Sequence, residues 1–328
     1  MLGGVSYTSI NPLYKNSNWY KIELTSKEET QDVYQDLKNK KIFDEVSLDY
    51  IMQGDAGTAA TEISGNEFFE QQKEYFNQHY ILDGYEFLKE HSVKPGGSKD
   101  VIVAVIDTGV DYNHIDLRKN IWKNVAEIPN NNIDDDNNGY VDDYYGYDFV
   151  NKDNDPIDDN GHGTHVAGII AADNNLIGTV GVAYNTQIMA IKAGNSSGYF
   201  NNSDIAEAIQ YAYMNGASVI NMSFGGSSIS LAVEDALKEA YNKCILVAAA
   251  GNDSLCNHIG CQIHKENTGV SYPAALPYVI GVMSSNVLEL NNQVLLISII
   301  IHMIMLNMKF MRLVNQFFPP GQITNMQN

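Results

Sequence analysis

The sequence is poor in cysteine. Three cysteines among 328 residues are too few for the disulfide framework that stabilises small secreted domains. Cys256 and Cys261 lie close together in a polar stretch and could pair, but their spacing alone leaves that pairing open. Cys244 begins an apolar run, so we expect it in the core.

Basic residues are also scarce. The chain has 20 lysines and arginines against 40 aspartates and glutamates, a net charge of -20. This balance excludes the Lys/Arg patches with which proteins bind nucleic acid. It indicates a solvated acidic surface, on which clustered carboxylates could bind Ca²⁺.

Long apolar segments are absent as well. The longest apolar run, 294–305, is interrupted by Ser298 and His302, and it is shorter than the roughly 18 residues that a membrane helix needs. Residues 1–9 have neither the charged nor the apolar region of a signal peptide. We therefore expect no membrane helix, and either a start upstream of Met1 or a protein not exported by that route.

The first 52 residues predict a small α+β unit. Residues 19–24 alternate between polar and apolar side chains and predict a strand. Thr25 or Ser26 begins a capping-box pattern that predicts a helix to about Lys40, and residues 42–50 alternate again. The Gly-, Ala-, Thr- and Ser-rich composition that follows predicts a linker over 53–74.

From residue 75 onward the pattern is that of an α/β domain. Short continuous apolar runs are typical of strands buried on both faces of a parallel sheet, and they occur at 101–106, 188–191, 218–222, 245–250 and 279–283. Helical patterns lie between them, one capped by Ser203 and ending near Asn215, another over 231–243. The alternation predicts a doubly wound, mostly parallel sheet, whose ligand site lies at the carboxyl ends of the strands.

Three motifs carry candidate chemistry at or beside those strand ends. The first apolar run ends in Asp107-Thr-Gly, which alone is also ordinary turn chemistry. A Gly-His-Gly-Thr-His-Val-Ala-Gly motif at 161–168 is far more specific, because His162 opens a predicted helix and could act as a general base oriented by a strand-end Asp. His165 is assigned a structural role. A third strand ends in Gly-Asn252, whose side-chain amide could donate to an oxyanion.

Together these segments resemble the subtilisin-like (S8) serine proteases over about 75–286. The resemblance implies that Asp107 and His162 are the aspartate and the base of a catalytic triad, and that Asn252 is the oxyanion donor. It also implies two backbone segments that pair with an extended peptide substrate. These are Ser223-Phe224-Gly225 on one side and Ser197-Gly198-Tyr199 on the other.

The nucleophile of that family is missing from this sequence. The resemblance places the serine in a Gly-Thr-Ser-Met-Ala segment downstream of the asparagine, and no Gly-Thr-Ser occurs anywhere in the chain. Ser298 lies in an apolar run without a preceding glycine and does not fit. Residues 287–328 do not continue the pattern, and a shifted reading frame, a fragment and a natural pseudoprotease remain open. We expect the chain as written to be inactive.

An acidic loop predicts a calcium site. The opening of an EF-hand loop is matched by Asp134, Asp136, Asn138 and the backbone carbonyl of Tyr140, and Asp143 or its neighbour Asp142 could replace the closing glutamate. A solvated acidic loop is the alternative. The resemblance implies a second calcium site with one carboxylate and a carbonyl-and-amide loop, made by the following residues: Asp116, Asn175, Ile177, Thr179 and Gln78.

The resemblance also gives the N-terminal unit a role. Residues 19–50 are similar to the later part of an inhibitory propeptide, which implies that the unit docks on the protease domain and that its tail enters the cleft. An unrelated small domain is the alternative. We therefore expect a secreted, monomeric, calcium-stabilised endopeptidase acting on extended polypeptides and inhibited by its own propeptide. A peptide-binding pseudoprotease is the alternative. A nucleotide-binding α/β protein is poorly supported, because the sequence has no glycine-rich phosphate-binding motif.

Overall fold

A six-stranded parallel sheet forms the centre of the protein. The computed structural model describes residues 7–25, 30–41, 43–54, 81–175, 177–251 and 270–282. In space the strands follow the order β11-β10-β8-β4-β6-β5, and every neighbouring pair is parallel. Their bounds are β4 Ile102–Asp107, β5 Gly146–Asp148, β6 Gln187–Lys192, β8 Val219–Met222, β10 Ile245–Ala249 and β11 Ile280–Val282. The predicted doubly wound α/β fold is confirmed.

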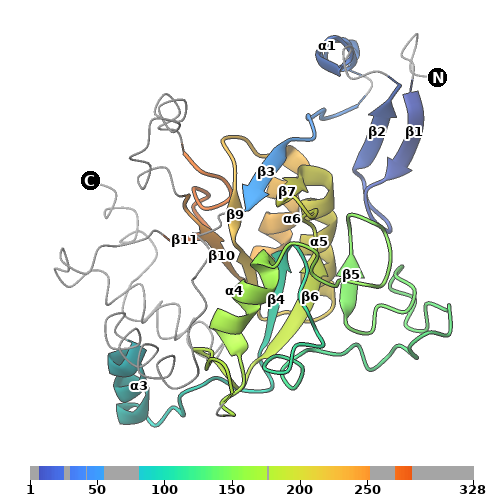
Figure 1. The fold of residues 1–328 in the computed structure, drawn as a ribbon. Coiled ribbons are helices and arrows are strands. Elements are labelled where there is room, and N and C mark those ends of the chain that lie inside the picture. The colour runs from blue at the N-terminus through green and yellow to red at the C-terminus, as the bar shows by residue number, and fades with distance from the viewer. Residues whose placement is uncertain are drawn as a thin grey trace.

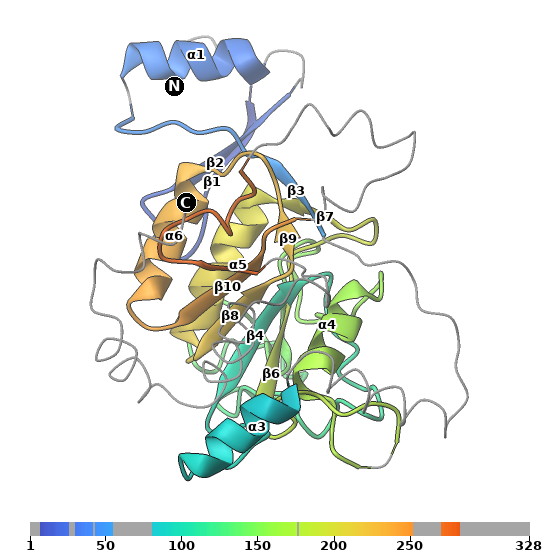
Figure 2. The same ribbon diagram turned by 90° about the vertical axis from the view of Figure 1, so that its left-hand side faces the viewer.

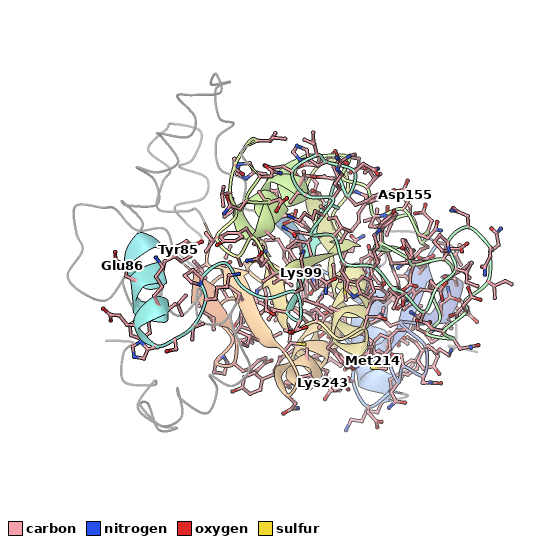
Figure 3. The ribbon with its side chains drawn as sticks, turned by 90° about the horizontal axis from the view of Figure 1, so that it is seen from below. Tyr85, Glu86, Lys99, Asp155, Met214 and Lys243 are labelled. Carbon is pink, nitrogen blue, oxygen red and sulfur yellow. The ribbon has the colours of Figure 1, made fainter. Side chains whose placement is uncertain are left out.

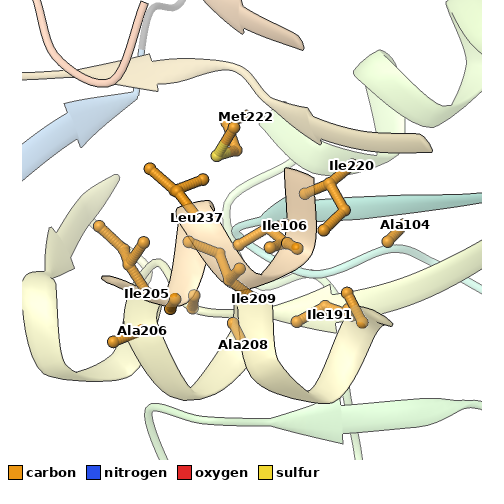
Figure 4. Close-up of a cluster of buried hydrophobic side chains, with 14 of the residues drawn as sticks. Ala104, Ile106, Ile191, Ile205, Ala206, Ala208, Ile209, Ile220, Met222 and Leu237 are labelled. Atoms are coloured by element: carbon orange, nitrogen blue, oxygen red, sulfur yellow. The ribbon is translucent and has the colours of Figure 1, made fainter. Parts of the chain in front are cut away.

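Helices cover both faces of this sheet. Helices α5 (Asn202–Met214) and α6 (Leu231–Tyr241) lie on one face and α4 (His162–Ala171) on the other (Figures 1 and 2). The side chains of β4 alternate between two core clusters, one with α5 and α6 and one with α4. Figure 4 shows Ile106 and Ile220 of the sheet packed against Ile209 of α5 and Leu237 of α6. Burial on both faces explains why the strands are continuously apolar.

The helix boundaries differ from the predictions in detail. Helix α5 begins at Asn202 with Asn201 as its N-cap, so Ser203 lies inside the helix and does not cap it with its own side chain. Within α4, Ile169 is half exposed, and Ala167 and Ile170 provide the buried contacts. Cys244 is buried as expected, whereas Cys256 and Cys261 lie outside the described residues.

Helix α3 (Ile81–Glu90) lies at one edge of the described structure, where Figure 3 shows Tyr85 and Glu86. Its Tyr85 hydroxyl donates to the carbonyl of Val182 at 2.7 Å, which links it to the main domain. Within the described ranges, no helix combines the length and apolarity needed to cross a membrane.

The N-terminal unit combines a hairpin and a helix. Strands β1 (Tyr7–Pro12) and β2 (Tyr20–Leu24) are antiparallel, and α1 spans Thr30–Lys40. The strand predicted over 42–50 is wrong, because residues 43–50 form no strand. The extended segment instead comes directly after that range, as β3 (Ile51–Gly54), and it does not pair with β1 or β2.

Strand β3 completes a separate three-stranded sheet on the main domain. It lies between β7 (Tyr199–Asn201) and β9 (Phe224–Gly225) and is antiparallel to both. Figure 1 shows β3 leaving the N-terminal unit and entering between these two strands. The end of the N-terminal unit therefore occupies the edge of the sheet where the candidate chemistry was expected.

Candidate active site

An imidazole and a carboxylate meet at the carboxyl end of β4. Asp107 is the last residue of β4 and His162 is the first residue of α4. The His162 Nδ1 lies 2.6 Å from the Asp107 Oδ1. This contact confirms that the structure brings the two sequence-predicted residues together, although they are 55 positions apart.

The Asp107 carboxylate is completely buried. Burial raises its pKa, while the hydrogen bond and charge of His162 and the backbone N–H of Thr108 oppose that rise. Its Oδ1 accepts from both His162 and Thr108, and its Oδ2 has no hydrogen-bond partner among the described residues. A carboxylate that accepts from Nδ1 holds the neutral imidazole in the tautomer whose Nε2 is a free base.

Glycine is required where the helix approaches the strand. A Cβ on Gly163 would lie 2.1 Å from the carbonyl oxygen of Gly109 and 2.9 Å from the Cβ of Asp107. Such distances are far inside van der Waals contact, so any side chain at Gly163 would push His162 away from Asp107. This close approach explains why the second glycine of the Gly-His-Gly motif cannot carry a side chain.

Asp158 is a positioning residue that the sequence analysis missed. Its Oδ1 accepts from the backbone N–H groups of Asn160 and Gly161 and from the Thr108 hydroxyl, and its Oδ2 accepts from the N–H and hydroxyl of Thr164. Burial alone would raise the pKa of Asp158, but these hydrogen bonds hold it below its ordinary value. Asp158 thus connects the end of β4 to the helix that carries His162. The only sign of this role in the sequence was an acidic residue just before the start of a helix.

Lys192 is a second group that the sequence analysis missed. Its ammonium, at the end of β6, is 1% exposed. It donates to the carbonyls of Thr108 and Gly194, both at 2.9 Å, and to the carboxylate of Asp159 at 2.6 Å. One buried charge therefore links the β4 end, the segment before β7 and the loop before α4. The only signal in the sequence was a lysine closing an otherwise apolar run.

Strand β3 occupies a cleft directly beside His162. Gly54 donates its N–H to the carbonyl of Gly198 at 2.9 Å, and a Cβ built on Gly54 would lie 3.9 Å from the Cε1 of His162. Tyr199 pairs with Gln53 from one side, and Phe224 and Gly225 pair with Gly54 and Gln53 from the other. An extended segment thus forms hydrogen-bonded pairs with both edges of the cleft, within reach of the imidazole.

The side chain of Met52 fills a closed apolar pocket. Met52 is 1% exposed and belongs to the same core cluster as Phe200 and Phe224, whose rings stack with centroids 4.6 Å apart. A Cβ on Gly226 would lie 3.1 Å from the Met52 Cγ. Ile51, on the opposite face of β3, is 65% exposed. The pocket therefore holds the side chain of Met52 while that of Ile51 faces outward, as expected for the alternating side chains of a strand.

The remaining predicted site residues lie at the margins of this cleft or outside the described chain. Ser197 donates its backbone N–H to Asn195, and Ser223 accepts from the Asn221 amide, so both flank the pairing segments. His165 is exposed on α4, so the structural role assigned to it finds no support in burial. Asn252 lies outside the described residues.

Ligands that were predicted for the first calcium site lie close together in the acidic loop. Carboxylate oxygens of Glu127, Asp134 and Asp136 lie within 4.8 Å of one another, the only such group in the described part of the chain. Glu127, which is buried, was not predicted, because it precedes the EF-hand pattern. Hard oxygen donors of this kind fit Ca²⁺.

Asn138 and Asp143 adjoin the same group. Asn138 bonds through its side-chain amide to Asp136 and, at 3.0 Å, to Asp143. Burial raises the pKa of Asp143 to about 6 against the effect of the Tyr211 hydroxyl bond. The ring of Tyr140 packs edge-on against Tyr211. The predicted ligand residues therefore adjoin one another, with Asp143 on the inner side of the loop.

The second predicted calcium loop folds around Asp116. The Asp116 Oδ1 accepts from the Asn175 amide and its Oδ2 accepts from the Thr179 backbone N–H, both at 3.0 Å. Ile177 donates its N–H to the Asn175 side chain. The structure thus brings these four residues together, while Gln78 lies outside the described chain.

Sequence comparison identifies relatives of this chain. It is 45% identical over 159 residues to a protein named thermophilic serine proteinase from Bacillus sp. (strain AK1), covering 48% of this chain and 34% of that protein. It is 37% identical over 202 residues to subtilisin DY of Bacillus licheniformis, covering 61% and 62%. With subtilisin-like protease 1 of Plasmodium falciparum (isolate 3D7) it shares 35% over 210 residues, covering 63% and 30%.

The chain therefore spans less than two thirds of the length of each of these relatives. The model of the Subtilase family matches residues 98–298, which include the β4 end, the His162 helix and both edges of the cleft. That match covers more than half of the chain and carries the same residues that form the site. The chain belongs to the subtilase family of serine peptidases.

Proposed function

We propose that this chain is a serine endopeptidase by lineage, of the kind that cleaves extended polypeptides, and that as written, without the nucleophilic serine, it is inactive. The observation that supports this most directly is the His162–Asp107 contact of 2.6 Å beside a cleft in which β3 is paired from both sides. A base and an aligned peptide backbone are what acyl transfer requires of such a site.

Each residue has a separate role in the proposed reaction. Asp107 fixes the imidazole tautomer, and His162 accepts the proton of a serine hydroxyl and returns it to the leaving amine. Asn252 would donate to the oxyanion that forms at the scissile carbonyl. The serine itself is missing, since no Gly-Thr-Ser occurs in the sequence. The chain as written therefore holds the base and its orienting acid but not the nucleophile.

The N-terminal unit is proposed as an inhibitory propeptide. Residues 51–54 occupy the cleft in the manner of a bound peptide, with Met52 in the apolar pocket and Gly54 against His162. A segment attached to the same chain has a high effective concentration, so it excludes other peptides from the cleft. The division at about 52, with a linker over 53–74, remains a prediction, and β3 crosses it.

A peptide-binding protein without catalysis is the second candidate. The closed Met52 pocket and the two pairing edges form a complete recognition surface that needs no serine. Secretion, as a monomer, is proposed for either candidate by family resemblance.

Calcium is proposed as a structural ion. In the acidic loop the ion would be held by Asp134, Asp136, Glu127 and the oxygen of Asn138. Its charge would neutralise the carboxylates that converge there. A second ion is proposed at Asp116 with the loop at 175–179. Neither ion takes part in the chemistry of His162.

Two experiments test the proposed function. The chain as written should not react with a serine-directed fluorophosphonate, and labelling would contradict its assignment as inactive. A chimera of residues 1–282 with Met52→Asp, which places a charge in the apolar pocket and releases the attached segment, followed by the corresponding serine-bearing segment of subtilisin DY, should hydrolyse a peptide substrate. That hydrolysis should disappear in His162→Ala and persist in the control His165→Ala. A folded chimera that hydrolyses peptide equally well with His162→Ala would refute the role of His162.

A further inference from the structure

The turn of the β1–β2 hairpin contacts the acidic loop. Lys15 lies in this turn, and its ammonium donates to the carbonyl of Asn137 at 2.5 Å (Figure 1). The stem of Lys15 lies against the loop as well, since a Cβ on Gly139 would be 3.5 Å from the Lys15 Cδ and 3.7 Å from its Cβ. One side chain of the N-terminal unit therefore contacts the loop on both sides of Asn138, a proposed calcium ligand.

The hairpin turn holds Lys15 in place. Leu13 is 6% exposed and belongs to the core cluster that includes side chains of α5 and α6. The Leu13 N–H donates to the carbonyl of Trp19, and the Ser17 N–H donates to the carbonyl of Tyr14, both at 2.9 Å. Because the backbone on either side of Lys15 is already ordered, the contact with the loop costs little further conformational entropy.

The acidic loop carries negative charge without a cation of its own. Its hydrogen-bond donors are neutral backbone N–H groups, asparagine amides and one tyrosine hydroxyl. Among the described residues, no lysine, arginine or histidine lies within salt-bridge distance of its carboxylates. Residues 127–143 include no lysine or arginine, and their acidic residues are Glu127, Asp134, Asp135, Asp136, Asp142 and Asp143. A cation brought to this loop from elsewhere is therefore favoured.

Two cations would share this loop, the Lys15 ammonium and the proposed calcium ion. The carbonyl that accepts from Lys15 belongs to Asn137, which lies between the proposed ligands Asp136 and Asn138. Like charges this close repel each other even where water screens them. When one ligand weakens the binding of a second, the second weakens the first by the same factor.

We propose that calcium in the acidic loop and the docking of the hairpin turn oppose each other through Lys15. The proposal rests on the calcium site of the proposed function. Bound calcium weakens one of the attachments between the N-terminal unit and the main domain, and the same unit carries residues 51–54, which fill the cleft. Calcium would thus favour opening of the cleft, and a docked N-terminal unit would lower the affinity of the loop for calcium.

The expected opposition is partial. Lys15 bonds to a backbone carbonyl and to none of the proposed ligand oxygens, so the ammonium and the ion can be present together. Only the repulsion between their charges couples them, which for an exposed pair changes an affinity about three- to tenfold. Direct competition for one oxygen would instead exclude one cation when the other is bound.

Calcium titration calorimetry on the full chain tests the coupling. The heat that disappears in the variant Asp134→Asn with Asp136→Asn belongs to the acidic loop. For that site, Lys15→Gln should bind calcium about three- to tenfold more tightly than the natural sequence. Lys15→Arg keeps the charge and should keep the natural affinity. Lys38→Gln removes the same charge from an exposed position on α1 and is the matched control, with an unchanged affinity.

Hydrogen exchange of the hairpin peptides covering 7–25 gives a second readout that does not depend on calorimetry. The ratio of the exchange rate with saturating calcium to the rate without it is compared between the natural chain and Lys15→Gln. This ratio should be about three- to tenfold larger in the natural chain. Any general stabilisation by calcium acts on both chains and cancels in the comparison.

The outcomes separate the coupling from the calcium site. Equal calcium affinities of the natural chain and Lys15→Gln would overturn the coupling while leaving the site intact. If Asp134→Asn with Asp136→Asn removes no heat, the loop does not bind calcium, and this part of the proposed function fails together with the coupling. A calcium effect on hairpin exchange that is the same in both chains, or smaller in the natural chain, would also contradict the opposition.

Discussion

At the scale of single residues, the site depends on groups whose charges are buried. Asp107 is completely buried with one oxygen unpartnered among the described residues, and Lys192 is buried against two carbonyls and Asp159. Buried charges of this kind require partners, because desolvation is costly. His162 supplies that partner to Asp107, which is why the imidazole is held in one orientation.

The first prediction concerns that orientation. Asp107→Asn replaces an acceptor-only group by one that can donate to Nδ1, so the neutral imidazole of His162 should change to the tautomer protonated at Nε2. Nitrogen-15 NMR of the imidazole distinguishes the two tautomers. Asp100→Asn, at an exposed position, is the matched control and should leave the His162 signals unchanged. An unchanged tautomer in Asp107→Asn would contradict the orienting role.

The second prediction concerns Glu207 on α5. Burial raises its pKa to about 7, against the opposing charge of Lys152 3.0 Å away. The folded state therefore holds a proton that the unfolded state releases between pH 4.5 and about 7. In that interval the folded state binds more protons, so its stability falls as the pH rises, by at most about 3 kcal/mol from this group.

Denaturant unfolding between pH 4.5 and 8 measures this dependence. Glu207→Gln cannot titrate, so its free energy of unfolding should fall less than that of the unmodified chain between pH 4.5 and 7. Glu86→Gln, at an exposed position on α3, is the control. Equal slopes in the unmodified chain and in Glu207→Gln would contradict a protonated buried carboxyl.

At the scale of helices and strands, α4 is positioned by the loop before it. Asp158 accepts from the N–H groups at the start of α4 and from Thr108 at the end of β4. Asp158→Ala should therefore lower the free energy of unfolding by about 2 kcal/mol and broaden the His162 imidazole signals. Asp155→Ala is the control, since Asp155 is exposed and its side chain accepts from the hydroxyl of Tyr112, away from the start of α4. Equal losses in both variants would refute the positioning role.

The central strands were predictable because their environment is simple. A strand buried on both faces is continuously apolar, and all five predicted runs became neighbouring parallel strands. Strand β3 was not predictable, because its four residues acquire their extended form from pairing with β7 and β9, some 150 positions later. Residues 43–50 show the opposite case, in which alternating side chains find no neighbouring strand and form none.

In the site, the predictable residues are those that lie in a local sequence motif. Asp107 and His162 lie in motifs whose glycines have steric roles, and the motif therefore identifies them. Asp158 and Lys192 act through contacts with Thr108, which is distant in sequence, and no local spacing marks them. Glu127 contacts the nearby acidic loop but lies before the EF-hand pattern, so that pattern does not include it. Their residue types alone are common on any acidic, solvated surface.

At the scale of the whole molecule, the N-terminal unit is connected to the main domain at several separate places. Its segment 47–54 crosses α5, α6 and the cleft, and Lys15 in its hairpin turn donates to the carbonyl of Asn137 in the acidic loop. Figure 1 shows the hairpin and α1 grouped at one end of the molecule. The acidic loop that is proposed to bind calcium therefore lies next to the docked unit.

Calcium removal is the fourth prediction. Binding at a hundredfold excess over the dissociation constant stabilises a protein by about 2.7 kcal/mol, so chelation should lower the Tm by several degrees. Asp134→Asn with Asp136→Asn should remove the share of that shift that arises in the acidic loop. Asp100→Asn should keep the full shift. A Tm that chelation leaves unchanged in the natural sequence would contradict both calcium assignments.

The central claim is that the chain folds as a subtilase whose cleft is filled by its own residues 51–54. Hydrogen exchange with mass spectrometry tests it most directly, on the natural sequence and on Met52→Asp, with Ile51→Asp as control because Ile51 is 65% exposed. We predict slow exchange in peptides covering 51–54, 198–201 and 224–226 for the natural sequence and the control. All three should exchange faster together in Met52→Asp. Exchange at 51–54 that is as fast in the natural sequence as in Met52→Asp would contradict the account.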